Sequence, residues 1–294
     1  MEIKKISDKN IVTRIGDVRL YIKQDEYGNF AKLASSGIDM GKDKFITMPK
    51  LKKDIDYKSM GLFTFIAYKF NTRVKNVNGS IFYEYFINVN AIAEDMKIFG
   101  LKARKETIES NLKKMLKQLA QCKEIVDFNK TSSSIRLTIK TKKYFSINED
   151  SIEKCLTATS SDIKKISKLG ILAEIAKYSV FENKNNEYLN KSICLVKQKD
   201  LCEYSSISTK QWKTLFDEIV KDGLLCFVKT YSPVYGTLKY YIADACSFDY
   251  LVWYLSYGKV AITSNIYIRE YYLNGVHFID EKEDYDYEDV QEVA

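Results

Sequence analysis

The chain has 294 residues, long enough for two domains with cores of their own, and 46% of its residues are hydrophobic. No apolar run approaches the about 20 residues of a membrane-spanning helix, and the start Met-Glu-Ile-Lys-Lys lacks the apolar segment of a secretory signal. These features exclude a membrane protein and predict a cytoplasmic location, while the net charge of +7 favours a polyanionic partner.

The first 44 residues are expected to form a small β region. Short alternating runs between Ile11 and Leu33 are interrupted at Gly16-Asp17 and at Tyr27-Gly28-Asn29. Alternation broken by turn residues is typical of strands joined by tight turns. The sequence therefore predicts an N-terminal β-meander in residues 1–44.

Residues 45–148 follow a specific order of elements. An apolar helix at 61–70 precedes a short strand with a second helix at 86–96, a basic third helix at 102–119 and a two-stranded ribbon at 124–145. Three helices followed by a hairpin make the winged helix-turn-helix order, whose third helix enters the DNA major groove. We expect a first winged-helix domain here.

The third helix of this domain is amphipathic. Its predicted core stripe is Ile108, Leu112, Met115, Leu116 and Leu119. Cations and short hydroxyl side chains, which suit phosphates and base edges, lie at its start or on the opposite side. The candidate DNA-binding residues are Lys102, Arg104, Lys105, Thr107, Ser110, Lys113 and Lys114. An ordinary solvated lysine face is the alternative interpretation.

The ribbon of the first domain is predicted from strands at 125–128 and 135–139 around a polar loop at 129–134. Lys130 and Arg136 are expected near its tip, where positive charge adds affinity for the DNA backbone. A hairpin that simply closes a small domain is the alternative.

Residues 149–162 are polar and rich in Ser and Thr, and they predict a linker. Residues 163–250 then repeat the same order, with elements at 170–178, 193–204, 208–220 and 224–248. Gly61 and Gly170 are 109 residues apart, and the first core positions of the third helices, Ile108 and Trp212, are 104 apart. With little residue identity between the copies, this is a repeat of pattern that predicts a second winged-helix domain.

The third helix of the second copy is expected to begin at Ser208-Thr-Lys-Gln211, which has the spacing of a capping box. Its predicted buried stripe is Trp212, Leu215, Phe216, Ile219 and Val220. A recognition helix reads bases with its N-terminal turns, and a ribbon lies along the backbone. The candidate residues are therefore Thr209, Lys210, Lys213 and Thr214, with Lys239 in the ribbon.

The C-terminal part is predicted to be a helical extension at 251–279, with helices at 248–255 and 262–273, followed by a disordered acidic tail at 280–294. Residues 277–294 hold eight acids and one base, which leaves 45 basic and 31 acidic residues and a net charge of +14 in residues 1–276. This balance favours polyanion binding, although lysine-rich codon usage is an alternative source of the charge.

Catalysis and metal binding are not expected. The six cysteines are scattered singly, and His277 is the one histidine in the chain. Zinc sites need Cys and His ligands at short spacings, a rolling-circle nuclease needs paired histidines, and no phosphate-binding P-loop is present. We therefore expect reduced thiols, no cofactor, no metal and no enzymatic activity.

The strand Phe45-Ile-Thr-Met-Pro49, the helix Lys58-Ser-Met-Gly-Leu-Phe-Thr-Phe-Ile-Ala-Tyr68 and the element Thr107-Ile-Glu-Ser-Asn-Leu-Lys-Lys-Met115 carry a family resemblance. Over residues 45–145 the chain resembles the N-terminal winged-helix domain of replication initiators from plasmids and phages of Gram-positive bacteria. It departs from that pattern at Asp56-Tyr57, where Leu-Ser is usual. The second half resembles two-winged-helix initiators in architecture alone.

The expected fold is thus α+β, with two tandem winged-helix domains, an N-terminal β-meander and a helical C-terminal extension with an acidic tail. The resemblance implies a sequence-specific binder of double-stranded DNA that recognises repeated origin sequences, acts without catalysis and recruits host replication proteins. A homodimer is left open. The alternatives are a transcriptional regulator of a mobile element and, from another class, a winged-helix module for protein–protein interaction.

Overall fold

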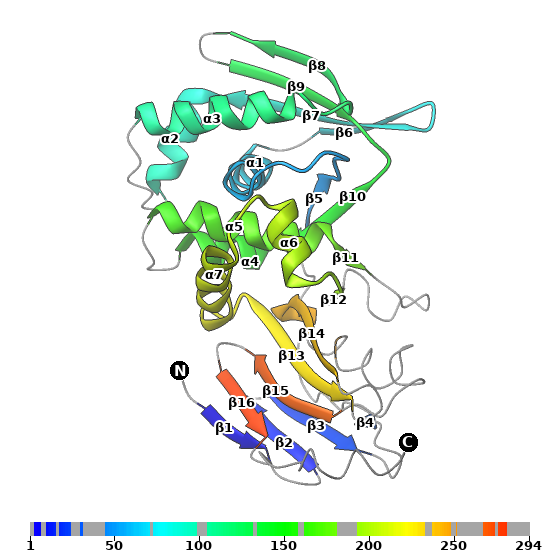
Figure 1. Cartoon of the computed structure of the whole chain (residues 1–294). Helices are drawn as coiled ribbons and strands as arrows, with labels where there is room; N and C mark the ends of the chain where they lie inside the picture. Colours follow the sequence, from blue (N-terminus) through cyan, green and yellow to red (C-terminus); the bar gives the residue numbers. More distant parts are fainter. Residues whose placement is uncertain are drawn as a thin grey trace. The chain divides into compact units, whose positions relative to one another are not determined.

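The computed structural model describes residues 3–6, 10–15, 18–24, 30–31, 45–70, 73–98, 105–131, 134–157, 162–180, 193–232, 237–247, 251, 267–273 and 276–280. These residues form a mixed α+β fold in which most strand pairs are antiparallel (Figure 1). Within the described ranges, no helix combines the length and the apolar character needed to cross a membrane.

The chain divides into two compact units, each built from separated stretches of sequence. The helical unit consists of residues 43–179 and 196–219, and the β unit consists of residues 1–42, 180–195 and 220–294. The helical unit therefore contains helices from both predicted winged-helix domains.

The first half of the helical unit runs in the order β5 (Phe45–Pro49), α1 (Tyr57–Lys69), β6 (Arg73–Val77), β7 (Ser80–Asn88), α2 (Val89–Ile98), α3 (Lys105–Leu119), β8 (Ile125–Lys130), β9 (Ser134–Lys140) and β10 (Tyr144–Asn148). β5 and β10 pair antiparallel with each other. The predicted helices and ribbon strands are present, with two additional strands: β6 ahead of the predicted strand in β7, and β10 after the ribbon.

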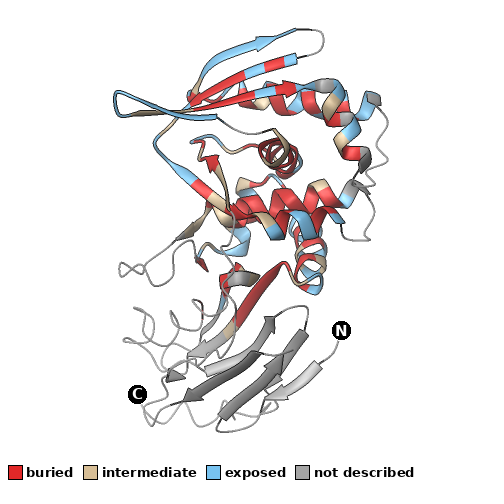
Figure 2. Cartoon of the chain, turned by 180° about the vertical axis from the view of Figure 1, so that it is seen from behind, coloured by how far each residue is buried: buried red, intermediate tan, exposed pale blue. Residues whose placement is uncertain are grey.

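Helix α1 is the central helix of this unit. Asp56 caps its start by accepting hydrogen bonds from the backbone N–H groups of Lys58 and Ser59, because the first N–H groups of a helix lack intrahelical partners. Ten of its thirteen residues are buried, including Phe63, Phe65 and Ile66. An apolar surface around the whole helix requires partners on several sides, and Figure 2 accordingly shows α1 buried along most of its length.

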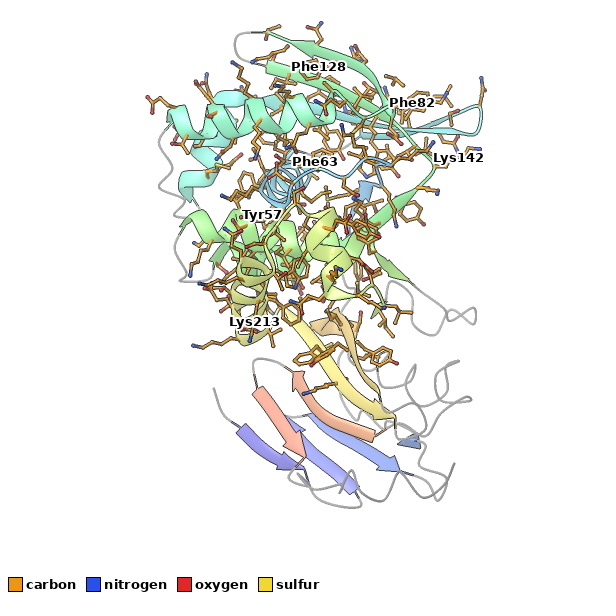
Figure 3. The ribbon with its side chains drawn as sticks, in the orientation of Figure 1. Tyr57, Phe63, Phe82, Phe128, Lys142 and Lys213 are labelled. Atoms are coloured by element: carbon orange, nitrogen blue, oxygen red, sulfur yellow. The ribbon has the colours of Figure 1, made fainter. Side chains whose placement is uncertain are left out.

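A four-stranded antiparallel sheet covers one side of α1, in the order β6-β7-β9-β8. Its inner face is lined by alternate residues of the two central strands, because successive side chains of a strand point to opposite faces. These residues are all buried: Tyr83, Tyr85, Ile87, Ile135, Leu137 and Ile139. The ring of Phe63 in α1 lies 5.1 Å from the ring of Tyr85, and Figure 3 shows Phe63 below the sheet.

The predicted linker at 149–162 is wrong for most of its length, because residues Glu149–Thr157 form helix α4. Asn148 caps this helix by accepting a hydrogen bond from the backbone N–H of Ser151. Ser151, Ile152, Cys155 and Leu156 are buried. Their i, i+1, i+4, i+5 spacing is that of one helix face, which the polar composition of the stretch concealed.

Helix α5 (Asp162–Lys177) packs directly against α1 through two glycines. A methyl group on Gly61 would overlap the backbone oxygen of Ile166, and one on Gly170 would overlap the backbone oxygen of Tyr57. Tyr57 and Ile166 are 109 residues apart, as Gly61 and Gly170 are. The contact is therefore reciprocal, as in an interface between two copies related by a twofold axis.

A short helix, α6 (Gln198–Tyr204), is joined by a four-residue turn to α7 (Thr209–Lys221). Ser206 in this turn has a φ of +50°, in the left-handed region. The turn is fixed to α1, since the backbone N–H of Tyr57 donates to the carbonyl oxygen of Ser205 at 3.0 Å. Helix α5 stops at Lys177, and strand β11 (Ser179–Val180) follows it.

Charged side chains bind the segment before α1 to the end of α5. Lys177 is buried, and its ammonium lies 2.5 Å from the Asp54 carboxylate. The hydroxyl of Tyr178 donates to the same oxygen at 2.7 Å, and the Lys50 ammonium donates to the Lys177 carbonyl at 2.5 Å. Glu174 is fully buried beside this cluster, with Oε2 at 3.7 Å from the Lys177 ammonium.

The β unit is organised around a seven-stranded sheet in the order β1-β16-β15-β13-β14-β12-β11. The strands not yet given are β1 (Ile3–Ile6), β12 (Ile193–Cys194), β13 (Leu225–Ser232), β14 (Thr237–Asp244), β15 (Tyr267–Leu273) and β16 (Val276–Asp280). A 3-10 turn, η1 (Ala245–Ser247), follows β14. Residues 11–33, predicted as a β-meander, contain β2 (Asn10–Ile15), β3 (Val18–Gln24) and β4 (Phe30–Ala31), which pair antiparallel in that order.

The helical extension predicted for residues 251–279 is wrong over the described residues 267–273 and 276–280. Tyr267–Leu273 is strand β15, which pairs antiparallel with β13, and Val276–Asp280 is strand β16. The segment Tyr-Ile-Arg-Glu-Tyr-Tyr-Leu is rich in β-forming residues, and β13 needs a partner for its backbone groups. His277 and Asp280 therefore belong to a strand. The predicted helix at 248–255, apart from Leu251, and the predicted tail at 281–294 lie outside the described residues.

Candidate nucleic-acid interface

Helix α3 has the predicted amphipathic division. Ile108, Leu112, Met115, Leu116 and Leu119 are all buried, as the spacing predicts. Thr107, Ser110 and Lys113 are exposed. Lys102 and Arg104 lie outside the described residues, and Lys105 begins the helix without a described side chain.

Lys114 is part of a structural contact. Its ammonium lies 3.2 Å from Oδ2 of Asp56, the residue that caps α1. The same carboxylate accepts hydrogen bonds from Ser59 Oγ and Gln118 Nε2, at 2.8 and 2.6 Å. Burial opposes ionisation of Asp56, but the bonds from Ser59, Gln118 and Lys114 together lower its pKa. Lys114 therefore joins α3 to α1, which its sequence position on the outward face did not indicate.

Helix α7 presents its predicted residues to solvent. Thr209, Lys210, Lys213 and Thr214 are exposed, and Figure 3 shows Lys213 projecting from the helix. The opposite stripe is buried, with Trp212 only 1% exposed, while Phe216 is half-buried. Ser208 caps the helix as predicted, since its Oγ accepts the backbone N–H of Gln211 at 3.3 Å.

The exposed charges of α3 and α7 have opposite signs at equivalent positions. With the 104-residue offset, Glu106, Glu109, Lys113 and Lys114 in α3 correspond to Lys210, Lys213, Asp217 and Glu218 in α7. At these four positions, the lysines lie in the N-terminal half of α7 and in the C-terminal half of α3, while Lys105 begins α3 and Lys221 lies in the last turn of α7. Lys210 and Lys213 thus lie in the first turns of α7, where a recognition helix contacts bases, whereas the described side chains at the equivalent positions of α3 are glutamates.

Glu218 makes the α7 counterpart of the Lys114–Asp56 contact. Its carboxylate lies 2.5 Å from the Lys164 ammonium and 3.3 Å from the Lys168 ammonium, both in α5. Burial opposes ionisation, but the two lysines lower the pKa of Glu218. Each copy thus joins its third helix to its first helix by an ion pair at the same position with the charges exchanged. Sequence reasoning missed both pairs, although Asp56 ahead of an apolar run is a recognisable helix-start signal.

The ribbon residues are placed differently from one another. Lys130 is exposed at the end of β8, as predicted for the tip. Arg136 lies on the outer face of the sheet, where its guanidinium stands 5.6 Å from the Phe86 ring centroid and 3.7 Å from the Asp127 carboxylate. The backbone of Lys239 pairs with Thr230 in the β13–β14 ribbon, but its side chain is outside the described part.

Five cysteines have described side chains, and all five are buried: Cys122, Cys155, Cys194, Cys202 and Cys226. Burial raises the pKa of Cys122 and of Cys202, so these two thiols are less reactive than an exposed one. Among the described residues, no group of three His, Cys, Asp or Glu side chains is arranged to hold a metal ion.

Comparison with protein-family models, with curated proteins and with solved structures found no match for the chain.

Proposed function

We propose that this chain is a non-catalytic, sequence-specific binder of double-stranded DNA, built from two winged-helix modules. The observation that carries the proposal is helix α7. Its N-terminal half exposes Lys210 and Lys213 between two threonines, its opposite stripe is buried, and the late acid Glu218 is neutralised by α5. Lysines and short hydroxyl side chains on the leading turns suit phosphates and base edges in the major groove.

The order of elements supports a module of the same type in each half. In the first half, β7, β9 and β8 form a sheet behind three helices, and in the second, β12, β14 and β13 follow the same pairing order. The reciprocal contact between α1 and α5 favours a twofold relation between the modules. A protein with such a relation recognises half-sites with matching symmetry, so we expect paired half-sites in the target.

The resemblance of residues 45–145 to plasmid and phage replication initiators gives the proposal its biological setting. We propose an initiator that binds repeated origin sequences and recruits host replication proteins. In this proposal α7 makes the main contacts with bases, and α3 contributes mainly through Lys113 and the basic residues at its N-terminal end.

The test is fluorescence anisotropy of the full chain with labelled duplexes that tile the DNA flanking its gene. Lys210→Ala with Lys213→Ala should weaken binding and reduce the salt slope by up to about two, since each lost phosphate contact removes about one. Lys221→Ala, an exposed lysine in the last turn of the same helix, is the matched control and should change little. Lys113→Ala tests α3 in the same assay.

Two results would overturn the proposal. One is the absence of any duplex in the tiled region that binds more tightly than unrelated DNA. The other is an unchanged salt slope in the Lys210 and Lys213 double variant, which would make these lysines an ordinary solvated surface.

A further inference from the structure

The outward side of the four-stranded sheet carries aromatic rings and cations in register. We call it the sheet face and define it by Arg73, Lys75, Phe82, Phe86, Arg136 and Lys140. Cross-strand pairing places Lys75 beside Phe82 and Phe82 beside Lys140 in one row, and Phe86 beside Arg136 in another. The alternate residues Tyr83 and Tyr85 of β7 are buried on the inner face, and Glu84 lies between them on the same side as Phe82 and Phe86.

Each aromatic ring of the sheet face is in contact with cations. The guanidinium groups of Arg73 and Arg136 lie 5.5 and 5.6 Å from the Phe86 ring centroid, and the Lys140 ammonium lies 5.5 Å from that of Phe82. Phe86 nevertheless remains 46% exposed. An apolar ring on a flat surface, flanked by two planar guanidinium groups, is unusual for a strand that needs only to close a core.

Carboxylates only partly balance the positive charge of the sheet face. Glu84 lies between the two phenylalanines on β7 and binds Lys75, at 2.8 and 3.0 Å, and this hydrogen bond lowers the pKa of Glu84. Asp127 on β8 lies 3.7 Å from Arg136. Four cations stand against these two acids, so the sheet face keeps a positive charge around its exposed ring.

We propose that the sheet face binds single-stranded DNA. Unpaired bases stack on exposed aromatic rings and on guanidinium planes, while their phosphates are attracted to surrounding cations. Duplex DNA is less suited to this surface, because the faces of its bases are already stacked on one another. The choice of DNA over RNA rests on the proposed function, whereas the stacking surface stands on its own contacts.

The binding is tested by anisotropy of the full chain with a labelled oligothymidylate of about 12 residues at low salt. Phe86→Ala should weaken binding about tenfold or more, the loss expected for one stacked base, and Phe86→Tyr should retain it. Phe128→Ala is the matched control. Phe128 is 41% exposed on the same sheet, but it pairs with the buried Leu137 and therefore lies on the opposite face of the sheet from Phe86. It should bind like the unmodified chain.

Additional measurements distinguish this inference from the proposed function and from the binding of RNA or of a second copy of the chain. The Lys210 and Lys213 double variant should keep its affinity for the oligothymidylate, and Phe86→Ala should keep its affinity for duplex DNA. The inference is overturned if the oligothymidylate does not bind, if Phe86→Ala binds it normally, or if an oligouridylate of equal length binds more tightly. It is also overturned if Phe86→Ala abolishes a concentration-dependent dimer in sedimentation while leaving oligothymidylate binding intact, since the face would then join two copies.

Discussion

The buried side chain of Glu174 has a pKa that differs from that of an exposed glutamate. It is fully buried in α5, and among the described residues neither of its carboxylate oxygens has a hydrogen-bond partner, since Lys177 at 3.7 Å is engaged by Asp54. Burial therefore raises its pKa from the usual 4.5 to about 7, with the nearby Lys177 acting in the opposite direction. A carboxyl group in the core of the helical unit thus ionises near neutral pH.

This pKa predicts a dependence of stability on pH. Between about pH 4.5 and 7 the folded chain holds a proton on Glu174 that the unfolded chain has lost. The free energy of unfolding therefore includes the full contribution of the protonated Glu174 below pH 4.5, and this contribution is lost as the pH rises to 7. The loss is on the order of 3 kcal/mol. Glu174→Gln should remove this part of the dependence and be the more stable protein at pH 8, as measured by urea unfolding at pH 5, 6, 7 and 8.

Glu153→Gln, in the exposed side of α4, is the control and should follow the pH dependence of the unmodified chain. A Glu174→Gln variant whose stability changes with pH as much as that of the unmodified chain would show that Glu174 does not titrate in this range.

At the scale of elements, the decisive contact is the crossing of α1 and α5. Their backbones meet where Gly61 and Gly170 leave room for a carbonyl oxygen of the other helix. Glycine weakens each helix by about 1 kcal/mol relative to alanine, so its presence at two equivalent positions requires a packing reason. The same crossing brings the ion pairs of Lys114 and Glu218 into equivalent places, one in each copy.

Gly61→Ala or Gly170→Ala should therefore destabilise the chain by about 3 kcal/mol or more, since a methyl group would overlap backbone atoms that no rotamer change can move. The gain in helix propensity is too small to offset this cost. Gly79→Ala is the comparison, because Gly79 has a φ of +75° but open space around it, and it should cost about 1–2 kcal/mol. Equal unfolding midpoints for Gly61→Ala and the unmodified chain would contradict the described crossing.

At the scale of the whole molecule, the sequence repeat and the compact units do not coincide. The helical unit takes α1, α2 and α3 from the first copy and α5, α6 and α7 from the second, and α4 occupies most of the predicted linker. The buried surface of α1 depends on α5, and the turn before α7 is hydrogen-bonded to the start of α1. The first copy therefore lacks part of its core when it is alone.

A fragment of residues 45–148 should consequently fail to unfold cooperatively, because α1 would expose the surface that α5 covers. A fragment of residues 43–219 retains that surface and should show a cooperative transition. Both are measured by circular dichroism during urea titration. If the shorter fragment unfolds cooperatively at the midpoint of the longer one, each copy is an independent domain.

Much of the local structure could be predicted from the order of the residues. Periodicity located α3 and α7 with their buried stripes, as in Ile108 to Leu119 of α3, and the capping signal at Ser208 located the start of α7. These features depend on neighbours within a few residues, which the chain order specifies directly. The exposed candidates Thr209, Lys210, Lys213 and Thr214 followed from the same periodicity.

Only the tertiary structure decided how these elements share their surfaces. Whether Lys114 faces DNA or Asp56, whether residues 149–157 are a linker or a helix, and whether Tyr267–Leu273 is a helix or the partner of β13 all depend on residues far away in the chain. The physical reason is that burial and charge pairing act between surfaces, and spacing along the sequence does not state which surfaces meet.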